Sequence, residues 1–266
     1  MRKGVITLLP KGEKPTNFLK NLRQVTLLPV EYKIISGSIA ERINRVLERL
    51  ISEQQVGFVP GRYIGECIRT TYDTLEWAKE HNKTGLLLLI DFEKAFDSIS
   101  YKYITKMLTF FGFDDYLIKW VEVLLYNFSA CINMAVNLTV LFEILSGARQ
   151  GDPIASPLFV LSIEILCTKL RNSHEVIPYT LGSTDISLSL FADDMSVFLK
   201  YCENNLRYAI NILSMFFKLS GLKIQLEKTQ VIVIGPVPHN YNLCPELELN
   251  WQQNFTLLGV VFNPKR

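Results

Sequence analysis

The segment that most limits the fold is a run of five apolar residues, Leu86 to Ile90, which ends at Asp91. A short apolar run without polar alternation is typical of a strand that is buried on both faces. Upstream, apolar positions recur at helical spacing with charged residues between them, which predicts helices over residues 31–50 and 64–81. A buried strand among amphipathic helices predicts a sheet with helices packed on it.

The remaining patterns place strands and helices in an order typical of an α+β fold, with an antiparallel sheet and helices packed on one side. Asp97-Ser98 is the predicted N-cap of a helix that ends at Phe111. Alternating Ser and apolar residues on both sides of Ala192 predict a hairpin over residues 186–199. We also expect strands at residues 5–9, 23–28, 223–226 and 229–234, a helix at 114–126, a helix that follows the 146–157 loop and ends at Leu170, and a helix at 203–219 closed by Gly221.

The segment Val123–Phe142 carries no charge over twenty residues, which is the length that a membrane helix needs. Polar residues interrupt it, and β-branched residues surround an Asn-Leu-Thr break, so two strands and a turn are the better interpretation. The N-terminus lacks the apolar core of a signal peptide. We therefore expect no membrane contact and an intracellular location, with nucleus and cytoplasm left open.

Composition excludes several classes of protein. The chain has 266 residues, 48% hydrophobic and 20% charged, which suits one large domain or two packed lobes and excludes a disordered or fibrous chain. Its five cysteines are scattered, and its three histidines, His81, His174 and His239, stand alone, so neither a disulfide framework nor a zinc site is supported. Residues 1–84 hold 14 Lys or Arg and 9 Asp or Glu, whereas the remainder has more acidic than basic residues. A basic half suits a polyanionic partner, although uneven charge is common on protein surfaces.

Adjacent aspartates, Asp193 and Asp194, fall at the tip of the predicted hairpin. Two like charges side by side repel each other, and a divalent cation would remove this cost. If the hairpin and the 86–90 strand are neighbours, Asp91 adds a third carboxylate. Three hard oxygen donors on strand ends suit two Mg²⁺ ions about 3.5–4 Å apart, the arrangement that serves in-line phosphoryl transfer. The alternative is that these aspartates only occupy turns or cap helices, as we expect for Asp97.

Four motifs in a fixed order carry a resemblance to a known family: Leu88–Asp97, Gly147–Pro153, Phe191–Asp194 and Gly221–Thr229. Together they resemble the reverse transcriptase of non-LTR (LINE-type) retrotransposons. Similarity continues upstream at Leu9-Pro10-Lys11, Asn21-Leu22-Arg23 and Gln55–Arg62, and downstream at Phe255–Gly259. The resemblance implies a right-hand polymerase with fingers at residues 1–85, a palm at 86–235 and a primer-grip-like segment at 236–266, where a thumb would begin.

The resemblance also implies roles for single residues. Asp91, Asp193 and Asp194 match the metal-binding carboxylates, for Mg²⁺ with Mn²⁺ as a substitute, and Lys228 matches a proton donor to the pyrophosphate leaving group. Phe96 matches an aromatic filter against a ribose 2′-OH. The other implied nucleotide-binding residues are Lys11, Arg23, Phe92, Gln150 and Gly151, and the implied template or primer contacts are Arg149, Gly57, Arg62, Leu258 and Gly259. Ordinary surface roles stay open for Lys11, Arg23 and Lys228, and core packing stays open for Phe96.

The expected function is RNA-directed DNA polymerisation, in which a primer 3′-OH is extended with deoxynucleoside triphosphates on an RNA template. Ala155-Ser156-Pro157 departs from the usual Leu/Ile-Ser-Pro spelling of the family, and Arg23-Gln24-Val25 from Arg-Pro-Ile. Since no endonuclease or complete thumb is recognisable, we expect a larger polyprotein. Two alternatives remain: a catalytically silent nucleic-acid-binding relic, and another metal-dependent phosphoryl-transfer enzyme such as a nuclease or nucleotide cyclase.

Overall fold

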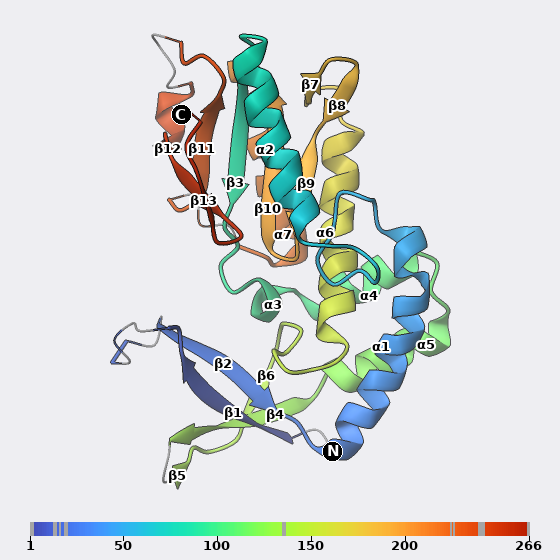
Figure 1. Cartoon of the computed structure of the whole chain (residues 1–266). Helices are drawn as coiled ribbons and strands as arrows, with labels where there is room; N and C mark the ends of the chain where they lie inside the picture. Colours follow the sequence, from blue (N-terminus) through green and yellow to red (C-terminus); the bar gives the residue numbers. More distant parts are fainter. Residues whose placement is uncertain are drawn as a thin grey trace. The chain divides into compact units, whose positions relative to one another are not determined.

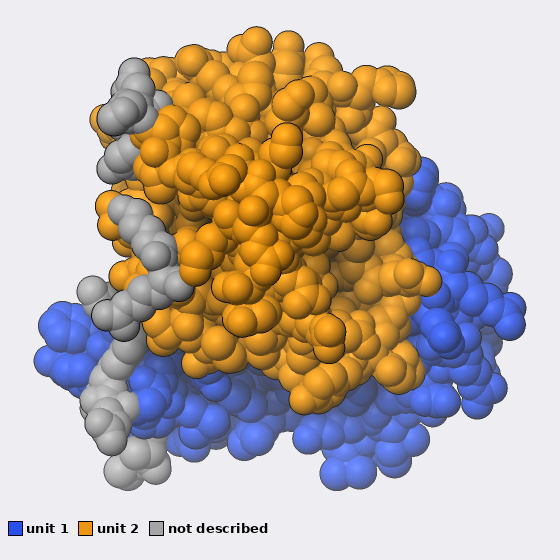
Figure 2. Space-filling view, turned by 45° about the horizontal axis from the view of Figure 1, so that its top comes forward, with its two compact units in different colours: residues 1–50, 94–161 blue, residues 51–93, 162–266 orange. Residues whose placement is uncertain are grey.

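The computed structural model describes residues 3–12, 15, 17–18, 21–134, 137–223, 225, 227–238 and 243–264. These form two compact units, residues 1–50 with 94–161 (unit 1) and residues 51–93 with 162–266 (unit 2), coloured blue and orange in Figure 2. The chain passes between the units three times, so each unit is built from two separate segments. The predicted boundaries of the fingers and the palm, at residues 85 and 235, do not coincide with the boundaries of these two units. The division into fingers and palm stays a prediction.

Unit 2 is built on a five-stranded sheet with the predicted buried strand, β3 (Gly85–Ile90), at its centre (Figure 1). β3 runs antiparallel to both of its neighbours, β10 and β11, and β10 pairs with β9 as the predicted hairpin. The strand at the far edge, β12, is parallel to β11, which the sequence did not indicate. The order across the sheet is β12 (Asn250–Gln252), β11 (Gln230–Ile234), β3, β10 (Asp194–Lys200) and β9 (Leu188–Phe191).

Both faces of this sheet are buried. Leu87, Phe198 and Ile232 pair across the three central strands and share a core cluster with α2 (Gly65–Glu80), which lies in front of the sheet in Figure 1. The next residue on each strand points to the opposite face and is equally buried, and α7 (Glu203–Ser220) contacts β10. The α+β class is confirmed, with one detail corrected: helices cover both faces, because the run Leu86–Ile90 is apolar on both.

Unit 2 also contains two short hairpins and a 3₁₀ turn. β13 (Phe255–Leu257) and β14 (Val260–Phe262) form a hairpin, whose turn is Leu258-Gly259, both at positive φ. β7 (Tyr179–Leu181) pairs with β8 (Thr184–Ile186), and Pro245–Leu247 forms a 3₁₀ turn, η2. α7 ends at Gly221, whose φ of 82° is the predicted left-handed C-cap. Within the predicted 223–226 strand, Ile224 and Leu226 lie outside the described residues, as does His239.

Unit 1 has a sheet of its own, in the order β2 (Leu22–Leu27), β1 (Lys3–Pro10), β4 (Phe128–Met134) and β5 (Asn137–Leu138), with β6 (Phe142–Ile144) also paired to β4. The predicted pair of strands within Val123–Phe142 is confirmed, since β4 pairs antiparallel with β5. The parallel pairing of β1 with β4 joins segments more than 120 residues apart. Among the described residues, no helix is both long enough and apolar enough to cross a membrane.

The helices of unit 1 follow the predicted pattern with one exception. α1 (Val30–Leu50) and α5 (Asp115–Leu125) are confirmed, and the Asp114 carboxylate caps α5 by accepting from Leu117 N at 2.9 Å. The predicted Asp97 cap is wrong. Asp97 lies inside a short helix, α3 (Ala95–Ser98), and extended backbone at Ile99 and Ser100 separates α3 from α4 (Tyr101–Phe110). α6 (Ala155–Arg171) follows the 146–157 loop as predicted, with its first seven residues in unit 1 and the rest in unit 2.

Candidate active site

The three predicted catalytic carboxylates gather at one end of the unit 2 sheet. Asp91 directly follows β3, and Asp194 is the first residue of β10. Because Ile90 pairs with Met195, the two aspartates occupy the same end of neighbouring antiparallel strands. Asp193 precedes Asp194 in the tight β9–β10 turn, after Ala192, whose φ is 58°. The condition that the sequence left open, that the two strands be neighbours, is therefore met.

Electrostatics at this sheet end favour a cation. Loss of surrounding water raises the pKa of the Asp194 carboxyl, and the negative charges of Asp193 and Asp91 raise it further. The Lys228 ammonium lies 3.8 Å from the Asp91 carboxylate, and both side chains are about half exposed, so the pair is weakly held. Carboxylate oxygens are the ligands that Mg²⁺ prefers. Across the described ranges, however, no group of three or more His, Cys, Asp or Glu side chains forms a ready-made metal cluster. The donor chemistry fits a divalent ion, although the side chains have not converged on one.

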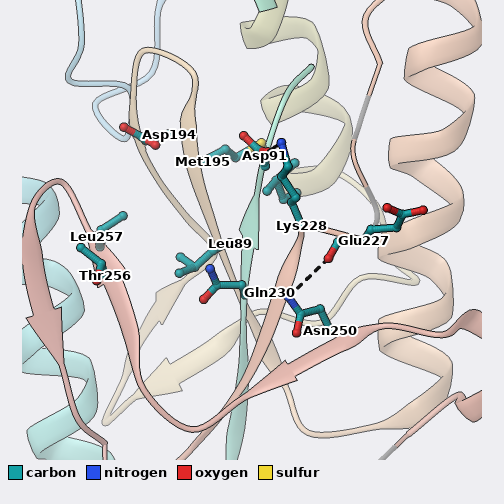
Figure 3. A pocket seen from close by; sticks show the side chains of 11 residues that line it. Leu89, Asp91, Asp194, Met195, Glu227, Lys228, Gln230, Asn250, Thr256 and Leu257 are labelled. Carbon is teal, nitrogen blue, oxygen red and sulfur yellow. Dashed lines mark hydrogen bonds and ion pairs between the residues drawn. The ribbon is translucent and has the colours of Figure 1, made fainter. Parts of the chain in front are cut away.

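A cavity of about 340 Å³ opens beside Asp91 and Asp194 (Figure 3). Its lining comes from the ends of β3 and β10, from the segment that leads into β11, from β12 and from β13. Asn250 Nδ2 donates to the Glu227 carbonyl at 3.3 Å and joins β12 to the segment that carries Lys228. The cavity is lined by Leu89, Ile90, Asp91, Asp194, Met195, Glu227, Lys228, Gln230, Asn250, Thr256 and Leu257.

The turn that carries Asp193 and Asp194 is supported from behind by a side chain that the sequence reasoning missed, Gln55. Its carboxamide is 1% exposed, accepts from Ala192 N at 3.2 Å and donates to the Ala192 carbonyl at 3.3 Å. Gly57, for which a template or primer contact was expected, is buried against the same turn, since a Cβ there would lie 2.2 Å from Ala192 N. The one sequence signal was that both residues belong to the Gln55–Arg62 motif.

Arg62, also an expected template or primer contact, directs its guanidinium to main-chain carbonyls of unit 2. It donates to the carbonyls of Ile51 at 3.0 Å and Gln55 at 2.5 Å, and also to that of Ser52. An arginine that binds three carbonyls of one loop fixes the shape of that loop. Arg62 therefore holds the chain segment from which Gln55 reaches the aspartate turn.

In unit 1, several predicted nucleotide-binding residues come together around the 146–153 loop. The Phe96 carbonyl accepts from Ala148 N at 2.7 Å, and its ring stacks on Phe159 with centroids 4.5 Å apart. Gln150 accepts from Thr26 N of β2 through its carbonyl at 2.9 Å, and its amide donates to Asp97 at 3.4 Å. The loop is thus joined to α3 on one side and to β2 on the other.

Gly151 lies where this loop approaches β2 most closely. Its φ is 100°, and a Cβ would be 2.8 Å from the Thr26 carbonyl oxygen, so only glycine fits. Lys11 and Arg23, the two expected triphosphate contacts, are exposed at one end of the β1–β2 pair, where Arg23 pairs with Leu9 and Lys11 N donates to the Asn21 carbonyl at 2.9 Å. Arg23 lies in β2, as Thr26 does, and Lys11 directly follows β1.

Arg149 and Phe92 are placed in the interior. Arg149 is 4% exposed; its guanidinium lies 4.0 Å from the Phe128 ring centre, pairs with Asp152 at 3.1 Å and donates to the Tyr32 hydroxyl. A template contact by Arg149 would require this network to open. In unit 2, the Phe92 ring is 7% exposed and packs edge-on against Phe217, with ring centres 5.9 Å apart.

Asp152 completes the buried network of unit 1 that surrounds Arg149. One carboxylate oxygen accepts from the Tyr32 hydroxyl at 2.8 Å, and the other from Ser36 and from Ile154 N. These hydrogen bonds satisfy the Asp152 side of the buried ion pair, whereas Nε and one terminal nitrogen of Arg149 have no hydrogen-bond partner among the described residues. The Arg-Gln-Gly-Asp-Pro motif thus contains two kinds of residue. Arg149 and Asp152 anchor the loop from the interior, whereas Gln150 and Gly151 form its outer edge.

Comparison with known proteins agrees with these motifs. A family model described as "Reverse transcriptase (RNA-dependent DNA polymerase)" matches residues 9–262. The "Transposon TX1 uncharacterized 149 kDa protein" of Xenopus laevis is 29% identical over 73% of this chain. The "Retrovirus-related Pol polyprotein from type-1 retrotransposable element R2" of Popillia japonica is 25% identical over 86% of this chain. The chain spans 15% and 32% of the lengths of these two relatives.

Solved structures show the same fold. Telomerase of Candida tropicalis in complex with a TWJ fragment of telomeric RNA superposes on 99% of this chain with a TM-score of 0.67, and the chain covers 44% of that protein. The apo telomerase of the same organism, truncated from the C-terminal domain, superposes on 98% of this chain with a TM-score of 0.63, and 53% of it is covered. Sequence identity is 12% in both cases, so the likeness concerns the fold alone. The expected polymerase fold is confirmed.

Proposed function

Because the matching model covers nearly all of its length, the chain belongs to the reverse transcriptase family, and we propose that it is the RNA-directed DNA polymerase part of a non-LTR retrotransposon protein. The observation that carries this proposal is the placement of Asp91, Asp193 and Asp194 at adjoining strand ends beside a cavity that also receives Lys228. In this proposal the chain extends a DNA primer with deoxynucleoside triphosphates on an RNA template.

Members of this family generally use divalent metal ions, and we propose that Asp91, Asp193 and Asp194 hold two Mg²⁺ ions here, with Mn²⁺ as a substitute. When bound, such ions supply charge neutralisation for the attacking hydroxyl and the leaving phosphate. Burial raises the pKa of the Asp194 carboxyl, and the negative charges of Asp193 and Asp91 raise it further. A bound cation would relieve that repulsion, which supports this assignment. Lys228, next to Asp91, is suited to neutralise or protonate the pyrophosphate that leaves.

Unit 1 contributes nucleotide recognition in this proposal. Lys11 and Arg23 bind triphosphate oxygens, since ammonium and guanidinium groups pair with phosphates. Gly151 allows close approach of the main chain to the nucleotide, with Gln150 beside it. The Phe96 ring, held by Phe159, excludes a ribose 2′-OH by its bulk. Arg149 acts from the interior by shaping the loop that bears Gln150 and Gly151.

Contacts to nucleic acid strands are proposed for the β13–β14 turn, where Leu258 and Gly259 would meet the primer. Gly57 and Arg62 act indirectly in this proposal: Gly57 packs against the main chain of the aspartate turn, and Arg62 binds the Gln55 carbonyl in the segment that supports this turn. Backbone phosphates dominate nucleic-acid binding, so the affinity for a primed template should fall steeply as salt is raised.

Primer extension tests the proposal directly. The purified chain is incubated with a primed RNA template, Mg²⁺ and four deoxynucleoside triphosphates, beside Asp193→Asn and the control Asp115→Asn, which changes an exposed aspartate in α5. We expect extension by the parent and by Asp115→Asn, and a loss of at least about 100-fold for Asp193→Asn. Salt-sensitive template binding without any extension would instead favour the silent binding relic. Cleavage of nucleic acid without added nucleotides would favour a nuclease.

A further inference from the structure

A short segment, Gln54–Gly57, lies along the outer edge of β9 in unit 2. Val56 N donates to the Leu190 carbonyl at 2.8 Å, and Leu190 N donates to the Gln54 carbonyl at 2.9 Å. Gln55 and Leu190 thereby form an isolated parallel bridge. Gln55 thus extends the sheet by one residue at its edge. It lies directly beside β9, the strand that leads into the aspartate turn.

The Gln55 side chain reaches from this segment to the turn itself. Its Oε1 accepts from Ala192 N, and its Nε2 donates to the Ala192 carbonyl, so one carboxamide binds both main-chain groups of one residue. Ala192 has a φ of 58°, a left-handed conformation that is unfavourable for a non-glycine residue and needs support from its surroundings. The next two residues in the chain are Asp193 and Asp194.

Gln55 is itself held in place. Its Oε1 accepts a second bond, from Gly57 N at 2.9 Å, and two main-chain N–H donors on one atom identify that atom as the oxygen of the carboxamide. Arg62 binds the Gln55 carbonyl at 2.5 Å. With 1% of its surface exposed, Gln55 is closely packed on all sides.

We propose that Gln55 is a positioning residue for polymerisation. Through its two hydrogen bonds to Ala192, it sets the position and orientation of the Asp193-Asp194 turn at the end of the sheet. The proposal rests on the proposed polymerase function for its catalytic consequence. Gln55 touches no reacting group in this assignment; it acts through the main chain of the turn. Because a displacement of about 1 Å in a catalytic group can cost roughly 100-fold in rate, losing the bridge should lower kcat and leave nucleotide KM within about twofold.

The chain offers a matched pair of variants. Gln55→Met keeps the length and volume of the side chain and removes its hydrogen bonds to Ala192. Gln54→Met makes the same change one residue earlier, where the carboxamide bonds Ser187 at 3.0 Å and Arg171 at 3.1 Å and does not reach the turn. Thermal melting of both variants shows whether each is folded; if Gln55→Met is not, Gln55→Leu, which also lacks both hydrogen bonds to Ala192 and has a shorter side chain, takes its place.

Two measurements are made on the full chain. Hydrogen exchange of the Ala192 amide, read without metal or substrate, should accelerate about tenfold in Gln55→Met and stay at the parent rate in Gln54→Met. Steady-state primer extension with Mg²⁺ should show kcat about 10- to 100-fold lower in Gln55→Met only. Unchanged Ala192 exchange in Gln55→Met, or unchanged kcat despite faster exchange, would overturn the proposal, as would equal losses in both variants.

Failure of the proposed function can be told apart from failure of this inference. If the parent chain binds template and never extends a primer, the polymerase assignment fails for this chain. The exchange measurement still decides whether Gln55 holds the turn, because it is read on the chain alone.

Discussion

Gly57→Ala probes the contact between the Gln54–Gly57 segment and the catalytic turn more severely than any other small change. The new Cβ would lie 2.2 Å from Ala192 N, 2.8 Å from Phe191 C and 3.0 Å from Ala192 Cα. All three are main-chain atoms, so no side chain can rotate to make room. Ordinary contact begins near 3.4 Å, and the two segments must therefore separate by roughly 1 Å. Overpacking of this kind costs about 1–3 kcal/mol of stability.

The same displacement should appear in catalysis. A 1 Å shift of Asp193 and Asp194 predicts a kcat roughly 100-fold lower, and the stability loss predicts a Tm lower by about 2–10 °C. Gly37→Ala is the control, since a Cβ there meets nothing within 4 Å and alanine favours a helix by about 1 kcal/mol. We expect Gly37→Ala to melt no lower than the parent and to keep its kcat. A Gly57→Ala variant with parental Tm and kcat would refute the reasoning, because it would mean that the two backbones are not in contact.

Three further predictions address the other parts of the molecule. Phe96→Ala should raise the ratio of ribo- to deoxynucleotide incorporation roughly tenfold or more, measured in parallel extension reactions; an unchanged ratio would remove Phe96 from sugar selection. Tyr32→Phe should cost about 1–3 kcal/mol in denaturant unfolding, because Asp152 and Arg149 lose a buried partner; a smaller loss would mean that water replaces the hydroxyl. Asp194→Asn should raise the Tm of the metal-free chain at neutral pH, because the raised pKa of Asp194 makes its charged form unfavourable in the folded state. That gain should shrink as the pH falls through the raised folded-state pKa and disappear only below the unfolded-state pKa of about 3.9, where Asp194 is protonated in both states; a gain independent of pH would contradict the electrostatic cause.

Local sequence patterns determined most of the elements of this protein. The 86–90 run, the helical period of residues 31–50, the 114–126 helix and the Gly221 helix end all act over a few residues, and each is confirmed. The aspartate hairpin could also be predicted, because alternation on both sides of a polar turn is a local signal. The predicted Asp97 cap was wrong because the helix is interrupted by extended backbone at Ile99 and Ser100. No local sequence pattern indicates this interruption.

Only the tertiary structure decided which polar side chains are buried and hold the site segments in place. Arg149, expected as a template or primer contact, is buried, and its partner Tyr32 lies 117 residues away in the sequence. Gln55 reaches Ala192 across 137 residues, and β1 pairs with β4 at a similar separation. Such partners depend on sheet order and register, which local propensity does not encode. The sequence by itself thus determined which carboxylates stand at strand ends, whereas long-range packing decided which polar side chains hold them there.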